Sequence, residues 1–322
     1  MEERMRIEHL VMGSLVNEPG DTTLSFTPGV SSGAEALCRM MAGDGPKHAS
    51  WYLLHPAAGQ HTIVHVQGSH TSFGGGVRDY ATRVVYEFDS AALTAAGGYL
   101  PLLPSLDAMR RYEEKRYEAS PEKMVKANTT GALSTVERQL LNDVAYSLAR
   151  HRRLFIRVGE DELRVADDLR QSPRLRSLLG VFDHLPQQWR DWISMAFSVN
   201  SSSGDAQALL ADIHVVVHHD PVEAWGDAAR GACVIDWTAT QPEWVPQEGD
   251  EDLPTDEDLL RLGETEPFTS DPSVSSGSST AGDAPVEAGR TQKAPVKRKG
   301  CVVNILATVL SIVLGYVCCH IL

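Results

Sequence analysis

The sequence reads Ser134-Thr-Val-Glu-Arg-Gln-Leu-Leu-Asn-Asp-Val-Ala-Tyr-Ser-Leu-Ala-Arg150 and then, after a short break, Leu154-Phe-Ile-Arg-Val158. Apolar residues recur every three or four positions from Val136 to Leu148, which predicts an amphipathic helix. Ser134 and Glu137 have the spacing of a capping box, so the helix is expected to begin there. The apolar run that follows predicts a strand. A helix leading into a strand indicates an α/β arrangement.

The same alternation continues toward the carboxyl end of the chain. We expect a helix, one further helical turn and three strands, at Asp167–Phe182, Gln187–Ile193, Ser194–Val199, Ile213–Val217 and Cys233–Trp237. Residues 126–245 are therefore predicted to form an α/β unit.

The amino-terminal part of the chain has a different sequence pattern, with short β-branched or aromatic runs separated by Gly and Pro. These runs predict five strands, at His9–Val16, Thr22–Phe26, Trp51–His55, Thr62–Gln67 and Arg83–Phe88. Two helices are expected as well, a short one at Ala34–Met41 and a charged one at Ser105–Glu118. Residues 1–125 are predicted to form a strand-rich α+β unit, on which the α/β unit packs.

Residues 246–300 have the composition of a disordered linker, acidic at first and then rich in Ser and Gly. Such a segment cannot bury enough apolar surface to offset the entropy of ordering. One island interrupts it, because Thr255 can cap a short helix that carries three leucines. The leucines Leu259, Leu260 and Leu262 mark either a docking peptide for a partner or a transient turn.

The segment from Cys301 to Leu322 contains no Asp, Glu, Lys, Arg or Pro. As a helix it would reach roughly 33 Å, enough to cross a hydrocarbon core of roughly 30 Å. A buried soluble helix is the alternative, but the segment follows a long polar tract. We therefore expect a transmembrane tail anchor that places Cys301, Leu306, Leu310, Leu314 and Leu322 in the bilayer.

Basic residues stand just before this segment, at Lys297, Arg298 and Lys299. The positive-inside tendency then keeps the bulk of the chain in the cytoplasm, with a single-pass carboxyl-terminal anchor. Small residues recur every four positions in the segment, at Ala307, Ser311 and Gly315. They either let two anchors associate as a homo-oligomer or reflect the ordinary tolerance of a span for small residues. Lipid modification or oxidation of Cys318 and Cys319 is left open.

Composition excludes several functional classes. The net charge is −14, and no dense basic face suggests nucleic acid. The five cysteines include no Cys-x-x-Cys pair, as expected in a reducing compartment. No P-loop, dinucleotide fingerprint, Gly-x-Ser-x-Gly elbow or His-Glu-x-x-His helix occurs, so we expect no cofactor and assign no catalytic residue.

Two features come nearest to chemistry. His61 and His65 lie four apart in a predicted strand, as do His214 and His218. Strand positions four apart are separated by about 13 Å, too far for both side chains to bind one ion, so no metal ligand is assigned. The glycine-rich segment Ser69–Tyr80 exposes amides that could cradle an anion, but a flexible hairpin connection explains it with fewer assumptions.

Three segments resemble the amino-terminal domains of bacterial GTPase-associated proteins from conflict and defence systems. They are Ile7-Glu-His-Leu-Val-Met-Gly13, Arg78-Asp-Tyr-Ala-Thr-Arg-Val-Val-Tyr-Glu-Phe88 and Leu178-Leu-Gly-Val-Phe-Asp-His-Leu-Pro-Gln-Gln-Trp-Arg-Asp-Trp-Ile-Ser194. The resemblance spans roughly residues 7–237 and implies a non-catalytic partner or sensor module beside a GTPase or membrane effector. Its motifs are packing patterns and supply no site residue.

These patterns together predict a tail-anchored adaptor or sensor that binds the lipid bilayer and presents a cytosolic module to a protein partner. The rival hypothesis is a membrane-tethered, hydrolase-like enzyme without a signature motif. Its chemistry would then lie near His61, His65 and the segment Ser69–Tyr80.

Overall fold

A computed structural model describes residues 2–13, 22–41, 50–57, 59–73, 76–103, 117–118, 122–126, 131–164, 171–197, 213–247, 250, 253–265 and 267. Met1–Thr269 form one compact unit. The expected anchor, its basic flank and most of the expected linker lie in the other unit, Ser270–Leu322, beyond the described residues. No helix in the described part of the chain is both long and apolar enough to span a bilayer.

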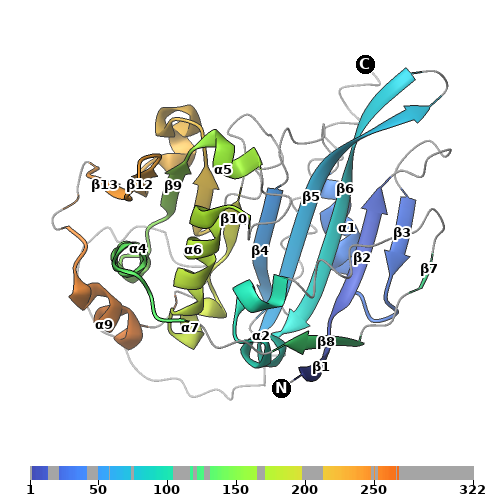
Figure 1. The fold of residues 1–322 in the computed structure, drawn as a ribbon, viewed down its shortest axis with the longest axis horizontal. Coiled ribbons are helices and arrows are strands. Elements are labelled where there is room, and N and C mark those ends of the chain that lie inside the picture. The colour runs from blue at the N-terminus through green and yellow to red at the C-terminus, as the bar shows by residue number, and fades with distance from the viewer. Residues whose placement is uncertain are drawn as a thin grey trace, which may run out of the picture. The chain divides into compact units, whose positions relative to one another are not determined.

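The described strands form an 11-stranded mixed sheet in the order β13-β12-β9-β11-β10-β4-β5-β6-β2-β3-β7, beside a 2-stranded sheet of β1 and β8 (Figure 1). Their bounds are β1 Glu2–Arg6, β2 Glu8–Gly13, β3 Thr22–Phe26, β4 Ser50–Ala57, β5 Gln60–Phe73, β6 Gly76–Asp89, β7 Tyr117–Glu118, β8 Glu122–Lys126, β9 Leu154–Val158, β10 Met195–Phe197, β11 Val215–His218, β12 Cys233–Trp237 and β13 Glu243–Val245.

Strand direction divides the large sheet into two regions. Strands β10, β11, β9 and β12 pair in parallel, as expected for helix-connected strands. Strands β4, β5, β6, β2 and β3 pair antiparallel. The two regions meet where β4 pairs antiparallel with β10, from Trp51↔Phe197 to Leu53↔Met195. We call this junction the seam.

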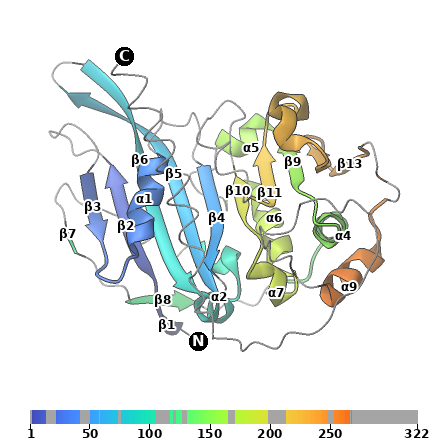
Figure 2. The ribbon, with the colours of Figure 1, turned by 180° about the vertical axis from the view of Figure 1, so that it is seen from behind.

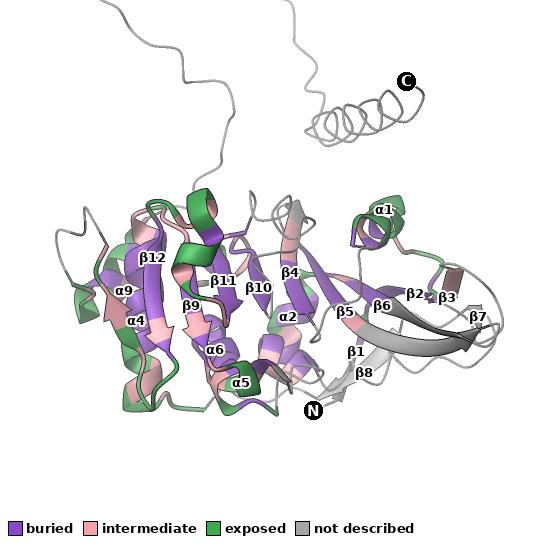
Figure 3. Ribbon diagram, turned by 90° about the horizontal axis from the view of Figure 1, so that it is seen from above, coloured by how far each residue is buried: buried purple, intermediate pink, exposed green. Residues whose placement is uncertain are grey.

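Helices cover both faces of the sheet (Figures 2 and 3). On one face a large apolar cluster includes residues of α2, α4, α6 and α9, and on the other a smaller cluster includes residues of α1 and η2. The helix bounds are α1 Ser32–Met40, α2 Ser90–Ala96, α4 Thr135–Ala149, α5 Glu160–Arg164, α6 Pro173–Asp183, α7 Gln187–Arg190, the 3-10 helix η2 Val222–Ala229 and α9 Asp256–Glu264.

The strand sequences explain this two-sided burial. Side chains alternate between the two faces of a strand, so Val84 and Tyr86 of β6 enter the large cluster while Val85 enters the small one. In β9, Ile156 and Phe155 divide between the clusters in the same way. Both regions of the sheet therefore contribute to both cores, and the chain has the mixed α/β architecture expected from its sequence.

The helix-and-strand pattern around Ser134 is confirmed. The hydroxyl of Ser134 accepts a hydrogen bond from the Glu137 amide at 3.2 Å, and the Glu137 carboxylate accepts one from the Ser134 amide at 2.8 Å. This reciprocal pair is the predicted capping box of α4. The predicted strand Leu154–Val158 and the predicted strand Cys233–Trp237 coincide with β9 and β12.

Two expected helices differ from the structure. The helix expected at Asp167–Phe182 corresponds to α6, which begins at Pro173 because Ser172 caps it by accepting the Leu175 amide and Pro173 fits the first helical position. The first part of the expected range, residues 167–170, lies outside the described residues. The charged helix expected at Ser105–Glu118 is wrong at its end, where Tyr117–Glu118 form strand β7. The rest of that segment lies outside the described residues.

The loop expected over Ser69–Tyr80 is largely strand. Strands β5 and β6 stay paired up to Phe73↔Gly76, which makes the connection a hairpin, as expected, but a much longer one. Most residues beside the central glycines are Ser, Thr, His, Val or Tyr, and several of these types favour extended backbone. The strand propensity of these residues therefore outweighed the loop that the glycines had indicated.

The expected boundaries also change. One sheet crosses the expected border between residues 1–125 and 126–245, so the described halves share their core. The expected disordered linker over residues 246–300 contains the ordered helix α9 near its start. That helix begins after Thr255, as predicted from its capping pattern, and packs chiefly against α4.

Candidate functional site

A buried network of polar side chains lies at one end of the seam. His55 stands near the end of β4 and His61 near the start of β5, and the tight turn between them contains Gly59 with a φ of 74°. Only a residue without a Cβ adopts this backbone conformation at little cost. The turn brings the two imidazole rings to a centroid separation of 4.6 Å at an angle of 77°.

Three hydrogen bonds link this pair to other elements. Nδ1 of His61 lies 3.0 Å from the Tyr99 hydroxyl, and its Nε2 lies 2.9 Å from the hydroxyl of Ser90, the first residue of α2. The Ser90 hydroxyl donates to the carboxylate of Asp191, just after α7, at 2.9 Å. The network therefore connects the antiparallel region to the α7–β10 segment, 101 residues away in sequence.

The hydrogen-bond directions follow from the donors available. Ser90 has one hydroxyl hydrogen and gives it to Asp191, so it can only accept from Nε2–H of His61. A neutral His61 then accepts the Tyr99 hydroxyl hydrogen at Nδ1. The chain of bonds runs in one direction, from Tyr99 through His61 and Ser90 to Asp191.

Burial keeps the imidazoles neutral. It lowers the pKa of His55 to about 3, and a proton on the nearby His61 or His214 would repel one on His55 and lower it further. Burial also lowers the pKa of His61, against the opposing pull of Asp191, and raises the pKa of Tyr99 well above its usual value. His61 is only 1% exposed, whereas the Asp191 side chain is 25% exposed.

The geometry favours a structural role over nucleophilic catalysis. A serine nucleophile needs a histidine nitrogen that accepts its hydrogen. Here His61 presents a donor to Ser90, and the hydroxyl hydrogen faces a carboxylate instead. Ser90, His61 and Asp191 are the residue types found in a hydrolase. In this arrangement their hydrogen bonds connect the two regions of the sheet.

The other histidines singled out from the sequence each pack against a tryptophan ring. His65 stacks on Trp51 at 4.1 Å, His214 lies 3.8 Å from the ring of Trp192, and His218 accepts the indole hydrogen of Trp225 at 3.1 Å. Within the described residues, no three His, Cys, Asp or Glu side chains gather in a way that would hold a metal ion.

A second candidate site is the docked helix α9, which carries the leucines of the expected docking peptide. Leu262 is fully buried in the large core and Leu259 is partly buried against it, whereas Leu260 is 71% exposed. In the described structure, the expected docking peptide therefore packs against its own chain. The sequence signal found the helix and its leucines but not the surface that receives them.

Polar side chains of the globule hold α9 at both ends. At its start, Asn142 donates to Asp256 at 2.6 Å and Arg150 donates to Asp258 at 2.9 Å. At its end, the Trp189 indole donates to the Leu262 and Thr265 carbonyls at 2.9 and 3.1 Å. Gln188 also donates to the Thr265 carbonyl, at 3.0 Å.

The acidic segment before α9 is attached as well. The Arg152 guanidinium pairs with the carboxylate of Asp250 and donates to the Gly231 and Ala232 carbonyls at 2.9 and 3.1 Å. Part of the acidic charge in this tract is thus neutralised by arginines at the end of α4 and in the turn after it. Sequence reasoning noted both charge groups but had no signal that paired them.

No protein-family model and no curated protein sequence matches this chain. The fold and the two candidate sites therefore rest on the chain's own geometry. What they define is a mixed α/β protein with a hydrogen-bonded histidine network at its seam and an acidic helix docked on its surface.

Proposed function

We propose that this chain is a tail-anchored membrane adaptor or sensor that presents a cytosolic protein-binding module. The observation that carries the proposal is the uncharged segment from Cys301 to Leu322, preceded by Lys297, Arg298 and Lys299. An apolar stretch of this length partitions into a bilayer, and the basic flank keeps the globule on the cytoplasmic side. The small residues Ala307, Ser311 and Gly315 support association of two anchors.

The described structure supports the non-catalytic part of this proposal. In the polar network at the seam, Tyr99, His61, Ser90 and Asp191 bond to one another, which suits a structural link. The acidic helix α9 is fixed to the globule immediately before the segment that leads toward the anchor. Such an arrangement gives the globule a defined point of attachment to its tether.

The proposed partner is a GTPase or a membrane effector in a bacterial defence or conflict system. This part rests on the resemblance of three segments to GTPase-associated proteins. In the structure these segments include β2, much of β6 and the α6–α7 region, which are packing elements of the core. They therefore bear on fold similarity and assign no catalytic role.

Cell fractionation tests the anchor. The full chain should sediment with membranes and require detergent for release, whereas a chain ending before Lys297 should remain in the supernatant. Recovery of the full chain in the detergent-free supernatant would overturn the proposal. The truncated chain should also bind the GTPase or membrane effector without turning over a nucleotide, ester or peptide.

A hydrolase-like, membrane-tethered enzyme is the second candidate. The observation in its favour is the approach of Ser90 to His61 and Asp191. If the chain hydrolyses an ester or peptide and Ser90→Ala abolishes that activity while the fold persists, this candidate replaces the adaptor. Equal activity of Ser90→Ala and the unchanged chain would exclude Ser90 as a nucleophile.

A further inference from the structure

We infer that the surface beneath α9 is a helix-binding groove, which the chain's own acidic helix occupies as a releasable latch. We define the groove by Asn142 of α4, by Arg150 directly after that helix, and by Gln188 and Trp189 of α7. A short acidic amphipathic helix of a partner protein displaces α9 and binds in the groove in its place. This inference deepens the proposed adaptor role, and its biological purpose rests on that role.

The groove recognises three separate features of a helix. Asn142 and Arg150 bind carboxylates in the first turn, at Asp256 and Asp258. The core receives one leucine, Leu262, whose side chain is fully buried. A helix whose first turn carries acids and whose last turn leaves carbonyls free is recognised at both ends and in its middle.

The carbonyl end of the helix is bound by side chains of the globule. The Trp189 indole N–H lies within 3.1 Å of two carbonyl oxygens, those of Leu262 and Thr265. Trp189 itself is fully buried, so its ring forms part of the core, while its indole N–H donates to the helix that lies in the groove. Removal of the occupant would leave that donor unpaired at the floor of the groove, and another helix end would satisfy it.

Helix α9 is a weak occupant. Gly263 lies inside it, has an ordinary helical backbone and has no atom within 4 Å of the place where a Cβ would stand. Glycine at such a position disfavours the helix relative to alanine without any gain in packing. Leu260 points away from the core and is 71% exposed. Docking uses Asp256, Asp258, Leu259 and Leu262, whereas Leu260 and Gly263 contribute little packing.

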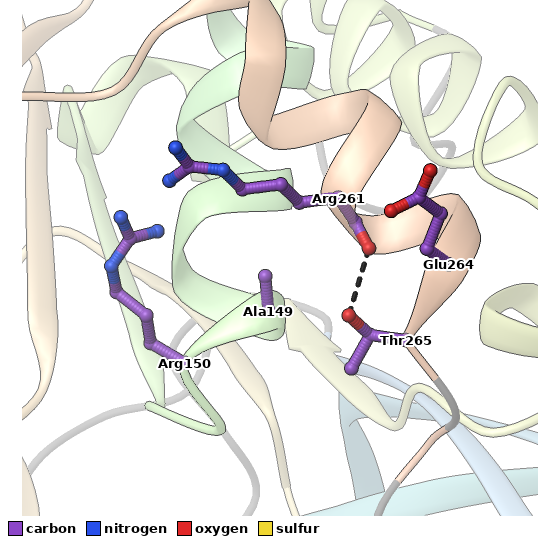
Figure 4. Close-up of a pocket in the computed structure, with 5 residues that line it drawn as sticks. All are labelled: Ala149, Arg150, Arg261, Glu264 and Thr265. Carbon is purple, nitrogen blue, oxygen red and sulfur yellow. Dashed lines mark hydrogen bonds between the residues drawn. The ribbon is translucent and has the colours of Figure 1, made fainter.

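A shallow surface depression lies along one edge of the docked helix. A volume of ≈ 440 Å³ lies between the carboxyl-terminal parts of α4 and α9 and is lined by Ala149, Arg150, Arg261, Glu264 and Thr265 (Figure 4). In the close-up the two guanidinium groups lie on one side of Ala149 and the Glu264 carboxylate on the other.

A partner helix fits these observations better than α9 of a second copy. A second copy would bring the same glycine and the same exposed leucine, so exchange would gain no contact. A helix with acids at its first and third positions, leucine at its seventh and no glycine at its eighth would retain the recognised features. The partner is thus defined by side-chain pattern, and a second copy becomes an outcome of the test.

The test uses the full chain in detergent and a fluorescent peptide of residues 253–267 that carries Gly263→Ala. We expect saturable binding, measured by anisotropy. Leu262→Ala in the chain weakens the latch and leaves the groove intact, so apparent affinity should rise about tenfold or more. Gly263→Ala in the chain strengthens the latch and should lower apparent affinity about two- to fivefold.

Variants of the groove residues should weaken peptide binding, whereas Leu262→Ala should strengthen it. Asn142→Ala with Arg150→Ala should reduce peptide binding at least tenfold even when Leu262→Ala is present, whereas Arg230→Ala, at an 81% exposed side chain after η2, should change it little. Hydrogen exchange of the α9 amides reports whether the latch has opened. If Leu262→Ala releases α9 yet the peptide does not bind, the groove is not a helix-binding site and the inference is overturned.

One more outcome distinguishes a helix of a partner protein from α9 of a second copy. If the Leu262→Ala chain binds no peptide but forms dimers that Arg150→Ala prevents, the occupant is a second copy and the partner assignment is overturned. Failure of these peptide measurements leaves membrane fractionation unaffected, and a chain that does not sediment with membranes can still bind the peptide. The inference and the proposed function therefore fail separately.

Discussion

At the scale of single residues, the seam network is notable because burial differs so much between its members. Tyr99 is 1% exposed and its hydroxyl faces Nδ1 of His61, whereas the Asp191 side chain is 25% exposed. A buried acceptor that loses its donor cannot turn to water, and an exposed group can. The cost of removing a partner should therefore depend on the end of the network that is changed.

Tyr99→Phe removes the donor to Nδ1 of the buried His61 and should lower the free energy of unfolding by about 1–3 kcal/mol. Asp191→Asn retains an acceptor for Ser90 at the exposed end and should cost under about 1 kcal/mol. Urea unfolding of the two variants measures the difference. Equal losses would contradict the directed network described here.

Buried histidines also predict an acid dependence of stability. Burial lowers the pKa of His218 to about 4, whereas an unfolded histidine titrates near 6.5. Between these pH values the unfolded chain binds more protons, so the stabilising contribution is present above pH 6.5 and is lost as the pH falls toward 4. His218→Gln should flatten this dependence by up to about 1.4 kcal/mol per pH unit.

Asp183 supplies a control of opposite sign for that experiment. Burial raises its pKa to about 7, although it accepts the Tyr99 and Leu100 amides at 2.7 and 3.1 Å. Its folded form therefore holds a proton that the unfolded form releases, and its contribution to stability is lost as the pH rises toward 7. Asp183→Asn should make the acid dependence steeper, where His218→Gln makes it shallower.

At the scale of elements, sequence predicted best where local signals agreed. The capping box at Ser134, the apolar face that follows it and the strand Leu154–Val158 are all local features, and each was confirmed. The network around His61 could not be predicted in this way. Its members approach one another only because β4 pairs with β10, a contact between distant segments that has no local signature.

Helix α9 shows the same division between local and distant information. Its start at Thr255 and its three leucines were readable in the sequence, because capping and periodicity are local. Its docking was not readable, since Asn142, Arg150 and Trp189 lie more than 70 residues away. Composition alone suggested disorder, and a few long-range hydrogen bonds with one buried leucine proved enough to order the helix.

The cap of α4 offers a test at this scale. Ser134→Ala removes the acceptor for the Glu137 amide and should lower the free energy of unfolding by about 1 kcal/mol. Ser134→Gly should cost only a few tenths, because glycine is tolerated at this position and leaves the amide open to water. Thermal or urea unfolding of the pair measures the cap. Identical losses would show that the hydroxyl does not cap the helix.

At the scale of the whole molecule, one sheet and two shared cores join regions that the sequence presented as separate units. We expect residues 1–269 to unfold in a single transition, because neither region can bury its apolar face alone. Trp51 is the one tryptophan of the first region, and the remaining five lie in the second. Tryptophan fluorescence therefore reports mainly on the second region.

Ile63→Val in β5 tests this cooperativity. Ile63 is 1% exposed, and loss of one methyl group should cost about 0.5–1.5 kcal/mol. Although Ile63 lies in the antiparallel region, the fluorescence midpoint should shift together with the far-UV circular dichroism midpoint. A fluorescence midpoint that stays fixed while the circular dichroism becomes biphasic would indicate two independent units.

The docking of α9 also decides how the protein would respond to mechanical load. A force applied to the chain beyond Thr265 reaches the bonds of Trp189 and Gln188 first, at one end of the helix. Bonds arranged along a helix and loaded from one end break one after another, which requires far less force than breaking them together. Tension on the carboxyl-terminal side would thus peel α9 away and uncover its groove while the sheet remained folded.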